Sequence, residues 1–258
     1  MGAVTSGYLC PTISVPVTLS LKTLIALALA AGCGRSGRSS APAATSEAPR
    51  SSAAAPSVGQ PAAQPAATPQ QAAQRGALAP LASEPLVVLP VQTLRTTVAD
   101  WSDKVGDSKT YLSTVDDEIA FAIRERALRG KWAFPPDLAR SARRNPTYAV
   151  DPYTIAIDNL AAVERDAEKI IAEPLAGQLR ALAGLFNARY AFIPVEMRLA
   201  PDAAGGGRAT IHVVVVDTRA AKLTWKGDIT GDSARAFSPA VAAGIAGRIA
   251  DLFTIPAR

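Results

Sequence analysis

Histidine, cysteine and aromatic residues are scarce in this sequence. Its 258 residues include one histidine, two cysteines and 14 aromatic residues (Phe 6, Trp 3, Tyr 5). Because His212 is the only histidine, catalytic triads and histidine-rich zinc sites lack their parts. Two cysteines are too few for a scaffold held together by several disulfides. We therefore expect no catalytic residues, no metal site and no cofactor.

Long hydrophobic runs are also lacking. The apolar run at residues 24–31 follows Lys22 and is much shorter than the stretch of about 20 residues that a membrane-spanning helix needs. This excludes a protein with several membrane spans. The length of the run and the lysine before it are typical of a signal peptide, which we predict at residues 1–32.

The predicted signal peptide ends at a cysteine. Leu29-Ala30-Ala31-Gly32-Cys33 resembles the bacterial lipobox, although Ala30 stands where that motif more often has leucine. The resemblance implies that Cys33 is lipidated, with acyl chains such as palmitate, and that this lipid holds the protein on a membrane. Because Gly34 follows the cysteine, it further implies the outer membrane, with the protein facing the periplasm. Two alternatives stay open, namely an ordinary signal peptide with an incidental cysteine and a start downstream of Met1.

Residues 33–83 have the composition of a disordered tether. Over residues 41–75, alanine, proline, glutamine, serine and threonine occupy 30 of 35 positions, and Val58 is the only large apolar side chain. Such a segment cannot bury enough apolar surface to offset the entropy of ordering it. The foldable part is then residues 84–258, whose 175 residues are enough for one domain with a sizeable core.

The charge of the foldable part excludes an electrostatic nucleic-acid binder. The whole chain has 27 Lys and Arg against 22 Asp and Glu, but five of the basic residues and one acidic residue precede residue 84. The remaining 22 basic and 21 acidic residues nearly cancel. Since neutralising phosphates needs a clustered basic surface, we expect no nucleic-acid partner.

Hydrophobic periodicity predicts an α/β fold, a single mixed-sheet domain with flanking helices. The continuous apolar run at residues 85–91 indicates a strand buried on both faces. Three alternating runs joined by short loops indicate a C-terminal antiparallel three-stranded meander with a central middle strand. These runs are residues 190–199, 208–217 and 222–229. The other predicted elements are a short strand at 132–134, helices at 113–129, 136–144 and 238–253, and two helices or one kinked helix between 157 and 189.

Three patches give the foldable part a resemblance to a known family. They are Val87-Val88-Leu89-Pro90, residues 182–193 (LAGLFNARYAFI) and residues 213–227 (VVVVDTRAAKLTWKG). The patches resemble envelope lipoproteins of the curli-secretion-pore and penicillin-binding-protein-activator type, which have a TolB N-terminal or anticodon-binding-like fold. The resemblance implies a domain that contacts another envelope protein, such as a cell-wall synthase or a secretion component. It assigns no contact residues, because the patches are structural patterns.

The residues that could support chemistry have structural interpretations. His212 lies on the predicted central strand and is expected to be packed or to face a hairpin. Asp116-Asp117-Glu118 is expected to be the acidic first turn of a helix that begins at Ser113, rather than a catalytic acid pair. Asp217 is expected to form a turn. Gly205-Gly206-Gly207 joins two strands, so we expect a flexible hairpin loop rather than a phosphate-binding loop before a helix.

For two groups of residues, the sequence is compatible with two interpretations. Arg140, Arg143 and Arg144 form either a solvated face or a site for an anionic polymer or acidic partner. A set of aromatic residues between the first strand and the long helical region forms either an exposed binding patch or a satellite core. This set is Trp101, Tyr111, Trp132, Tyr148 and Tyr153.

These observations favour a non-enzymatic lipoprotein that binds another envelope protein as an accessory or activator, for example of cell-wall synthesis. One alternative is a self-assembling subunit of a secretion or outer-membrane complex, because the oligomeric state is open. The other is an unrecognised ligand-binding or hydrolytic domain. That alternative requires Asp116, Asp217 and His212 to cluster at one cavity.

Overall fold

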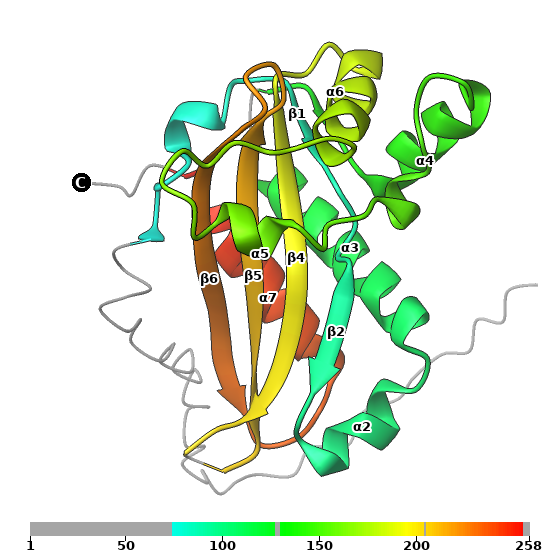
Figure 1. Ribbon diagram of the computed structural model, residues 1–258. Coiled ribbons are helices and arrows are strands. Elements are labelled where there is room, and N and C mark those ends of the chain that lie inside the picture. The colour runs from blue at the N-terminus through cyan, green and yellow to red at the C-terminus, as the bar shows by residue number, and fades with distance from the viewer. Residues whose placement is uncertain (1–73, 127–129, 204, 255–258) are drawn as a thin grey trace, which may run out of the picture. The chain divides into compact units, whose positions relative to one another are not determined.

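The computed structural model describes residues 74–126, 130–203 and 205–254, in which a mixed sheet lies between two layers of helices (Figure 1). Along the sheet the order is β3-β1-β4-β5-β6, and β2 also pairs with β4. The predicted α/β fold with one mixed sheet is therefore confirmed. Cys33 lies outside the described residues. The strands are β1 (Leu86–Val88), β2 (Thr93–Thr96), β3 (Trp132–Ala133), β4 (Tyr190–Pro201), β5 (Gly207–Asp217) and β6 (Lys222–Ala234).

The last three strands form the antiparallel meander that the sequence predicted. β5 pairs with β4 on one side and with β6 on the other, so it is the central strand of the three. Ile211, Val213 and Val215 point from β5 into one hydrophobic cluster, and Val214 and Val216 point into a second cluster on the opposite face. This alternation places the core on both sides of the sheet.

β1 and β2 lie one after the other along the same edge of β4, and both run parallel to it. β1 pairs with Tyr190–Phe192, and β2 pairs with Glu196–Leu199. Pro90 lies between the two strands and has no backbone N–H to donate. β2 was not predicted, because its residues alternate only between exposed and half-buried and include no strongly apolar face.

Helices α3 (Ser108–Glu125) and α7 (Pro239–Asp251) cover one face of the sheet (Figure 1). The short helix α2 (Ala99–Val105) adds Trp101 to the core on this side. Phe237 packs against both Trp101 and Tyr111, with ring centroids 5.6 and 5.3 Å apart. These rings join α2 and α3 to the segment that leads into α7.

The opposite face of the sheet is covered over only part of its length. Helices α4 (Pro135–Arg144), α5 (Leu160–Val163) and α6 (Leu175–Leu185) pack there over Val214 and Val216 of β5. Arg208, Thr210 and His212 follow on the same face of β5 but belong to neither hydrophobic cluster. We call this second part of the face, formed by β2, β4, β5 and β6, the open half of the sheet.

Helix α3 begins five residues before the predicted start. Its N-cap is Asp107, whose side chain accepts hydrogen bonds from the backbone N–H (2.8 Å) and the hydroxyl (2.7 Å) of Thr110. These hydrogen bonds lower the pKa of Asp107. Ser113 is therefore not the cap, and the expectation that Asp116 lies in the first turn was wrong. Asp116 lies in the middle of the helix and is buried.

The remaining elements agree with the sequence in kind and differ in extent. β3 and α4 are confirmed, whereas the first of the two helices expected between 157 and 189 is only the single turn of α5. The 3-10 helix η1 (Ala79–Leu81) follows Leu78, which is buried in the core, so packed structure begins ahead of residue 84. A second 3-10 helix, η2 (Pro152–Thr154), precedes α5. Within the described part of the chain, no helix combines the length and apolar character needed to cross a bilayer.

The loop between β4 and β5 contains two glycines with positive φ. These are Gly205 (φ +86) and Gly206 (φ +83). A Cβ on Gly206 would lie 2.2 Å from the carbonyl oxygen of Ala234, whereas a Cβ on Gly205 would meet nothing within 4 Å. The loop therefore needs glycine for its backbone conformation at both positions and for close packing at only one.

Gly206→Ala is expected to destabilise the protein more than Gly205→Ala. Both substitutions place a side chain in the left-handed region, at a cost of about 1–2 kcal/mol. Only Gly206→Ala adds a contact that the backbone must move to relieve, which brings the expected loss to about 3 kcal/mol or more. Urea unfolding of the full chain measures both losses. Equal losses would show that residue 206 has room for a methyl group.

Candidate functional site

Asp116, Asp217 and His212 lie in three separate polar clusters. Asp116 bonds to the backbone of Val91, Asp217 pairs with Arg189, and His212 contacts Asp228 and Glu164. Over the described residues, no hydrogen bond or ion pair joins any two of the three. They therefore do not form the single cluster that the hydrolytic alternative requires.

Asp217 shapes the turn between β5 and β6, as the sequence indicated. Its Oδ1 accepts hydrogen bonds from the backbone N–H of Arg219 (3.0 Å) and Ala220 (3.1 Å). Its Oδ2 accepts from Nε (2.8 Å) and Nη2 (2.7 Å) of Arg189. Burial alone would raise the pKa of Asp217, but these hydrogen bonds outweigh it and lower the pKa. The carboxylate is held ionised as part of the turn.

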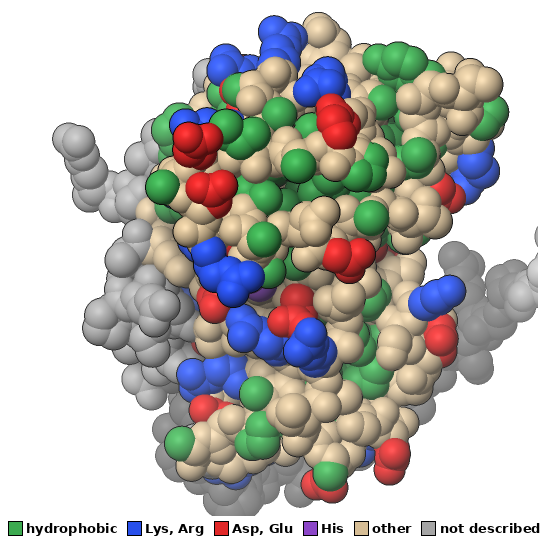
Figure 2. Space-filling model, viewed as in Figure 1, with side chains coloured by type: hydrophobic (Ala, Val, Ile, Leu, Met, Phe, Trp, Pro, Cys, Tyr) green, Lys and Arg blue, Asp and Glu red, His purple; other side chains and the backbone are tan. Residues whose placement is uncertain are grey.

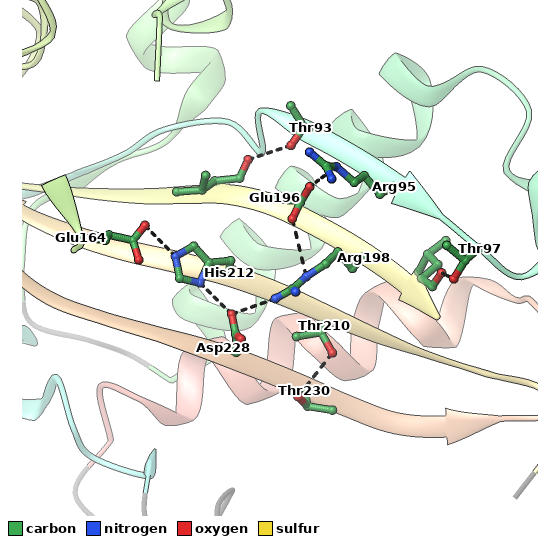
Figure 3. A network of polar contacts seen from close by, with 12 residues as sticks. Thr93, Arg95, Thr97, Glu164, Glu196, Arg198, Thr210, His212, Asp228 and Thr230 are labelled. Carbon is green, nitrogen blue, oxygen red and sulfur yellow. Dashed lines mark hydrogen bonds and ion pairs between the residues drawn. The ribbon is translucent and has the colours of Figure 1, made fainter. Parts of the chain in front are cut away.

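A network of charged side chains crosses the open half of the sheet (Figure 3). Glu196 on β4 pairs with Arg95 on β2 and with Arg198, and Arg198 also pairs with Asp228 on β6 (3.1 Å). In the space-filling view, basic and acidic side chains lie interleaved in a band across this face (Figure 2). Because the two signs alternate and pair, this surface offers no single-sign patch to a charged ligand.

His212 extends this network from the sheet to the segment after α5. Its Nδ1 lies 2.7 Å from Oδ1 of Asp228, and its Nε2 lies 3.0 Å from Oε1 of Glu164 (Figure 3). A neutral imidazole has one N–H, so only the imidazolium donates to both carboxylates. Lys226 adds a second link, since its Nζ donates to the backbone oxygen of Glu164 (3.0 Å). These contacts give His212 a structural role, which is to hold the segment after α5 against the sheet.

Asp116 is a buried carboxyl group without a cationic partner among the described residues. Its Oδ1 accepts a hydrogen bond from the backbone N–H of Val91 (2.8 Å), and its Oδ2 has no hydrogen-bond partner there. Burial raises the pKa of Asp116 to about 8, and the charge of Asp117 adds to this, although the bond from Val91 opposes it. At neutral pH the group is therefore mainly the neutral acid.

Asp116 also lines a pocket of about 330 Å³, which we call the Asp116 pocket. The pocket lies between the connection from β1 to β2, the first half of α3, and η2. Apolar side chains and a few polar ones line it, as is usual for ligand sites. The lining residues are Pro90, Val91, Gln92, Lys109, Leu112, Ser113, Asp116, Tyr153 and Thr154.

The aromatic residues singled out in the sequence divide between the two interpretations. Trp101 and Tyr111 are buried and Trp132 is half-buried against Phe253, so these three belong to the core. Tyr148 and Tyr153 are 58% and 50% exposed. Both lie on residues 145–154, which follow α4 and include η2 and which we call the aromatic segment. Tyr153 also lines the Asp116 pocket, whereas the hydroxyl of Tyr148 lies close to Gly184 of α6.

The arginines of α4 form a solvated face. Arg140, Arg143 and Arg144 are all exposed, and Arg140 pairs with Asp137 one turn earlier on the same helix (3.2 Å). This agrees with the simpler of the two interpretations.

The burial of Asp116 was missed because the start of α3 was placed too late. The signal that could have found it is the pair Asp107 and Thr110, which has the spacing of an N-cap and its N3 residue. With that start, Tyr111, Val115 and Ile119 recur at intervals of four and define the buried face. Asp116, next to Val115 on the helix, lies close to that face.

Comparison with known proteins gives structural similarity only. No family model and no curated protein matches the sequence. The LpoB C-terminal domain from Escherichia coli aligns with 58% of this chain and 84% of its own, at 12% identity and a TM-score of 0.30. The PelC dodecamer from Paraburkholderia phytofirmans aligns over 69% and 91%, at 12% identity and a TM-score of 0.33.

A third solved structure has the same level of similarity. Lipoprotein GNA1162 from Neisseria meningitidis aligns with 60% of this chain and 85% of its own, at 12% identity and a TM-score of 0.27. The resemblance noted in the sequence and the structural comparison thus point to the same kind of envelope protein, but the structural similarity is low. At such TM-scores the similarity carries no argument about function.

The free energy of unfolding is expected to fall as the pH rises from about 4 to about 8. The pKa of Asp116 is about 8 in the folded state and near the ordinary 3.8 in the unfolded chain, so the folded state binds more protons over this range. The stabilisation is fully present below the lower value and is lost as the pH rises through the upper one, by up to about 1.4 kcal/mol per pH unit. Chemical unfolding at a series of pH values measures the slope.

Two aspartate variants test whether this slope comes from Asp116. Asp116→Asn keeps an oxygen that accepts from Val91 and cannot ionise, so its stability profile should lose the slope. Asp117→Asn removes the charge of the exposed neighbour and should keep it. A wild-type profile parallel to that of Asp116→Asn would contradict the assignment.

His212→Ala is expected to loosen the segment after α5. The loss of stability should be about 1 kcal/mol, because the contacts are charge-assisted but partly exposed. Backbone amides of residues 160–170 should exchange hydrogen faster, as measured by mass spectrometry. Thr210→Ala is the matched control, since Thr210 lies two residues away on the same face and bonds to Thr230 instead. Unchanged exchange in His212→Ala would show that His212 does not hold this segment.

Proposed function

We propose that the protein is a bacterial envelope lipoprotein that binds another envelope protein as a non-enzymatic accessory or activator, for example of cell-wall synthesis. Residues 1–32 are the signal peptide, Cys33 carries the lipid, and residues 34–73 are the tether of a domain whose core already includes Leu78. The lipid lies in the outer membrane and the domain faces the periplasm. The motif at residues 29–33 supports the anchor.

The length of the tether supports a partner at some distance from the membrane. The 40 residues from Gly34 to Ala73 would span about 35 Å as a random coil and at most about 125 Å as extended polyproline II. The tether therefore allows the domain to contact a partner tens of ångströms from the lipid anchor. This suits a partner that is separated from the outer membrane by other envelope material.

The observation that carries the binding function is the exposed aromatic segment, whose Tyr153 lines the Asp116 pocket. Tyr148, Val150 and Tyr153 are exposed there, although the core takes up most other aromatic residues. Exposed tyrosines contribute strongly to protein interfaces, because they supply a large contact area with few rotatable bonds. The separation of Asp116, Asp217 and His212 supports the non-enzymatic part of the proposal.

Cys33→Ala is expected to weaken or abolish recovery of the partner. The test is crosslinking in intact cells, followed by co-purification and identification of the captured proteins by mass spectrometry. Wild-type protein should recover one envelope protein, such as a cell-wall synthase or a secretion component. The variant should be released from the membrane fraction, which is measured in the same cells.

The double variant Tyr148→Ser/Tyr153→Ser is expected to stay on the membrane and to lose the same partner. Phe121→Ser is its control, because Phe121 is a 60% exposed aromatic residue outside the aromatic segment. Retention of the partner by the double variant would remove the aromatic segment from the interface. Recovery of the protein alone, with homo-oligomeric rings by light scattering, would overturn the proposal in favour of self-assembly.

A further inference from the structure

We infer that the Asp116 pocket binds a protonated alkyl amine, supplied by a lysine side chain of the partner. The source of the amine rests on the proposed function. The amine would lie between the β1–β2 connection, α3 and η2, with its charge against Asp116.

When Asp116 is ionised, its unpartnered oxygen is an acceptor that calls for a hydrogen-bond donor. Asp116 is 5% exposed, and Val91 occupies only its Oδ1. A buried polar atom left unpaired costs about 1–3 kcal/mol, so native structures rarely keep one. Among the described residues nothing donates to Oδ2. A ligand that brings a donor into the pocket would remove this cost.

The charges around the pocket favour a cationic donor. Burial is the largest cause that raises the pKa of the Tyr153 phenol. Negative charge on Asp116, Asp117 and Asp151 raises this pKa further, and the positive charge of Arg143 lowers it. Lys109 is the only basic residue among those that line the pocket. Once Asp116 is ionised, three carboxylates in and around the pocket therefore outnumber two basic side chains. The local field therefore attracts a positive group more than a negative one.

The shape and chemistry of the lining favour an ammonium over a guanidinium. Pro90, Val91 and Leu112 provide apolar contact for an alkyl chain, and about 330 Å³ is the volume of roughly ten water molecules at ~30 Å³ each. A guanidinium binds carboxylates best through two parallel hydrogen bonds. Asp116 offers only one oxygen, since the other accepts from Val91. An ammonium group acts as a point charge and needs only that one oxygen.

Lys109 is a competitor built into the same helix. It precedes Asp116 by seven residues on α3, which is about two helical turns, so both lie on the same side of the helix and line the pocket. Its side chain is exposed and makes no ion pair among the described residues. Removing its charge should therefore strengthen amine binding.

Amine binding is linked to deprotonation of Asp116. The acid is mainly neutral at pH 7 and must ionise to pair with an ammonium, so binding releases a proton. The other charged or titratable groups are Lys109 on α3, Tyr153 on η2, and Asp117, Asp151 and Arg143 around Tyr153. With a pKa of about 8, the affinity should rise about tenfold from pH 7 to pH 9, where an amine of pKa about 10.4 stays charged.

The test is calorimetric titration of the full-length lipoprotein in detergent micelles. Nα-acetyl-lysine methylamide is the probe, the norleucine analogue is its neutral counterpart, the arginine analogue tests the head group, and n-butylamine represents a free amine. Titrations in two buffers of different ionisation enthalpy count the protons released. Near pH 7 close to one proton should be released by the lysine compound, and at pH 9 almost none.

The variants show whether Asp116 is the group that binds. Asp116→Asn should weaken binding of the lysine compound by about tenfold or more and abolish its pH dependence, whereas Asp117→Asn should change it by less than about twofold. Lys109→Met should strengthen binding, which a misfolded pocket would not do. Equal binding of the norleucine compound, tighter binding of the arginine compound, or no effect of Asp116→Asn would overturn the inference.

Crosslinking in cells separates this inference from the proposed function. Loss of the partner in Asp116→Asn, with retention in Asp117→Asn, supports a lysine of the partner as the ligand. Retention in Asp116→Asn overturns that source, and tight binding of n-butylamine would then identify a free amine. Amine binding by a protein that recovers no partner would overturn the proposed function and leave the pocket assigned. Recovery of a partner by a protein that binds no amine would overturn the amine site and leave the proposed function supported.

Discussion

The pairing of both β1 and β2 with the single long strand β4 is the constraint on which the rest of the structure depends. β1 is buried between β3 and β4, whereas β2 lies farther along the same edge of β4, where one face is open. Residues 89–92 connect the two strands along this edge of β4. The N–H groups of Leu89 and Gln92 reach carbonyl oxygens of β4, Pro90 has no N–H, and Val91 has to find another acceptor.

That acceptor explains why a carboxyl group lies in the core. Asp116 satisfies Val91 from the middle of α3, and a buried backbone N–H without a partner would be destabilising. A carboxyl group has two oxygens and Val91 uses one, so the other is left without a hydrogen-bond partner among the described residues. The Asp116 pocket lies at this connection between β1 and β2. Lys109 and Tyr153 are the other titratable side chains that line it.

The same constraint determines where the sheet is open. α4, α5 and α6 cover the end of β4 and β5 that lies beside β1, and beyond it Thr210 and His212 take the place of valines on the same face of β5. Polar side chains there pair with one another across four strands, as Arg198 does with Glu196 and Asp228. Pairing across strands stabilises an exposed sheet face without apolar cover. The charged side chains of the open half thus pair mainly with one another.

By itself the sequence determined the α/β class, the central position of β5 and the turn at Asp217, because periodicity of apolar residues and turn chemistry are local properties. It also indicated a lipidated Cys33, which lies outside the described residues. Only the tertiary structure decided that β2 exists, since its strand pairing with β4 comes from residues about a hundred positions away. It likewise decided that Asp116 is buried and that Tyr148 and Tyr153 are exposed. Burial and hydrogen bonding at these positions depend on which distant segments pack against them, and the local N-cap pair Asp107 and Thr110 indicates only the helix face near which Asp116 lies.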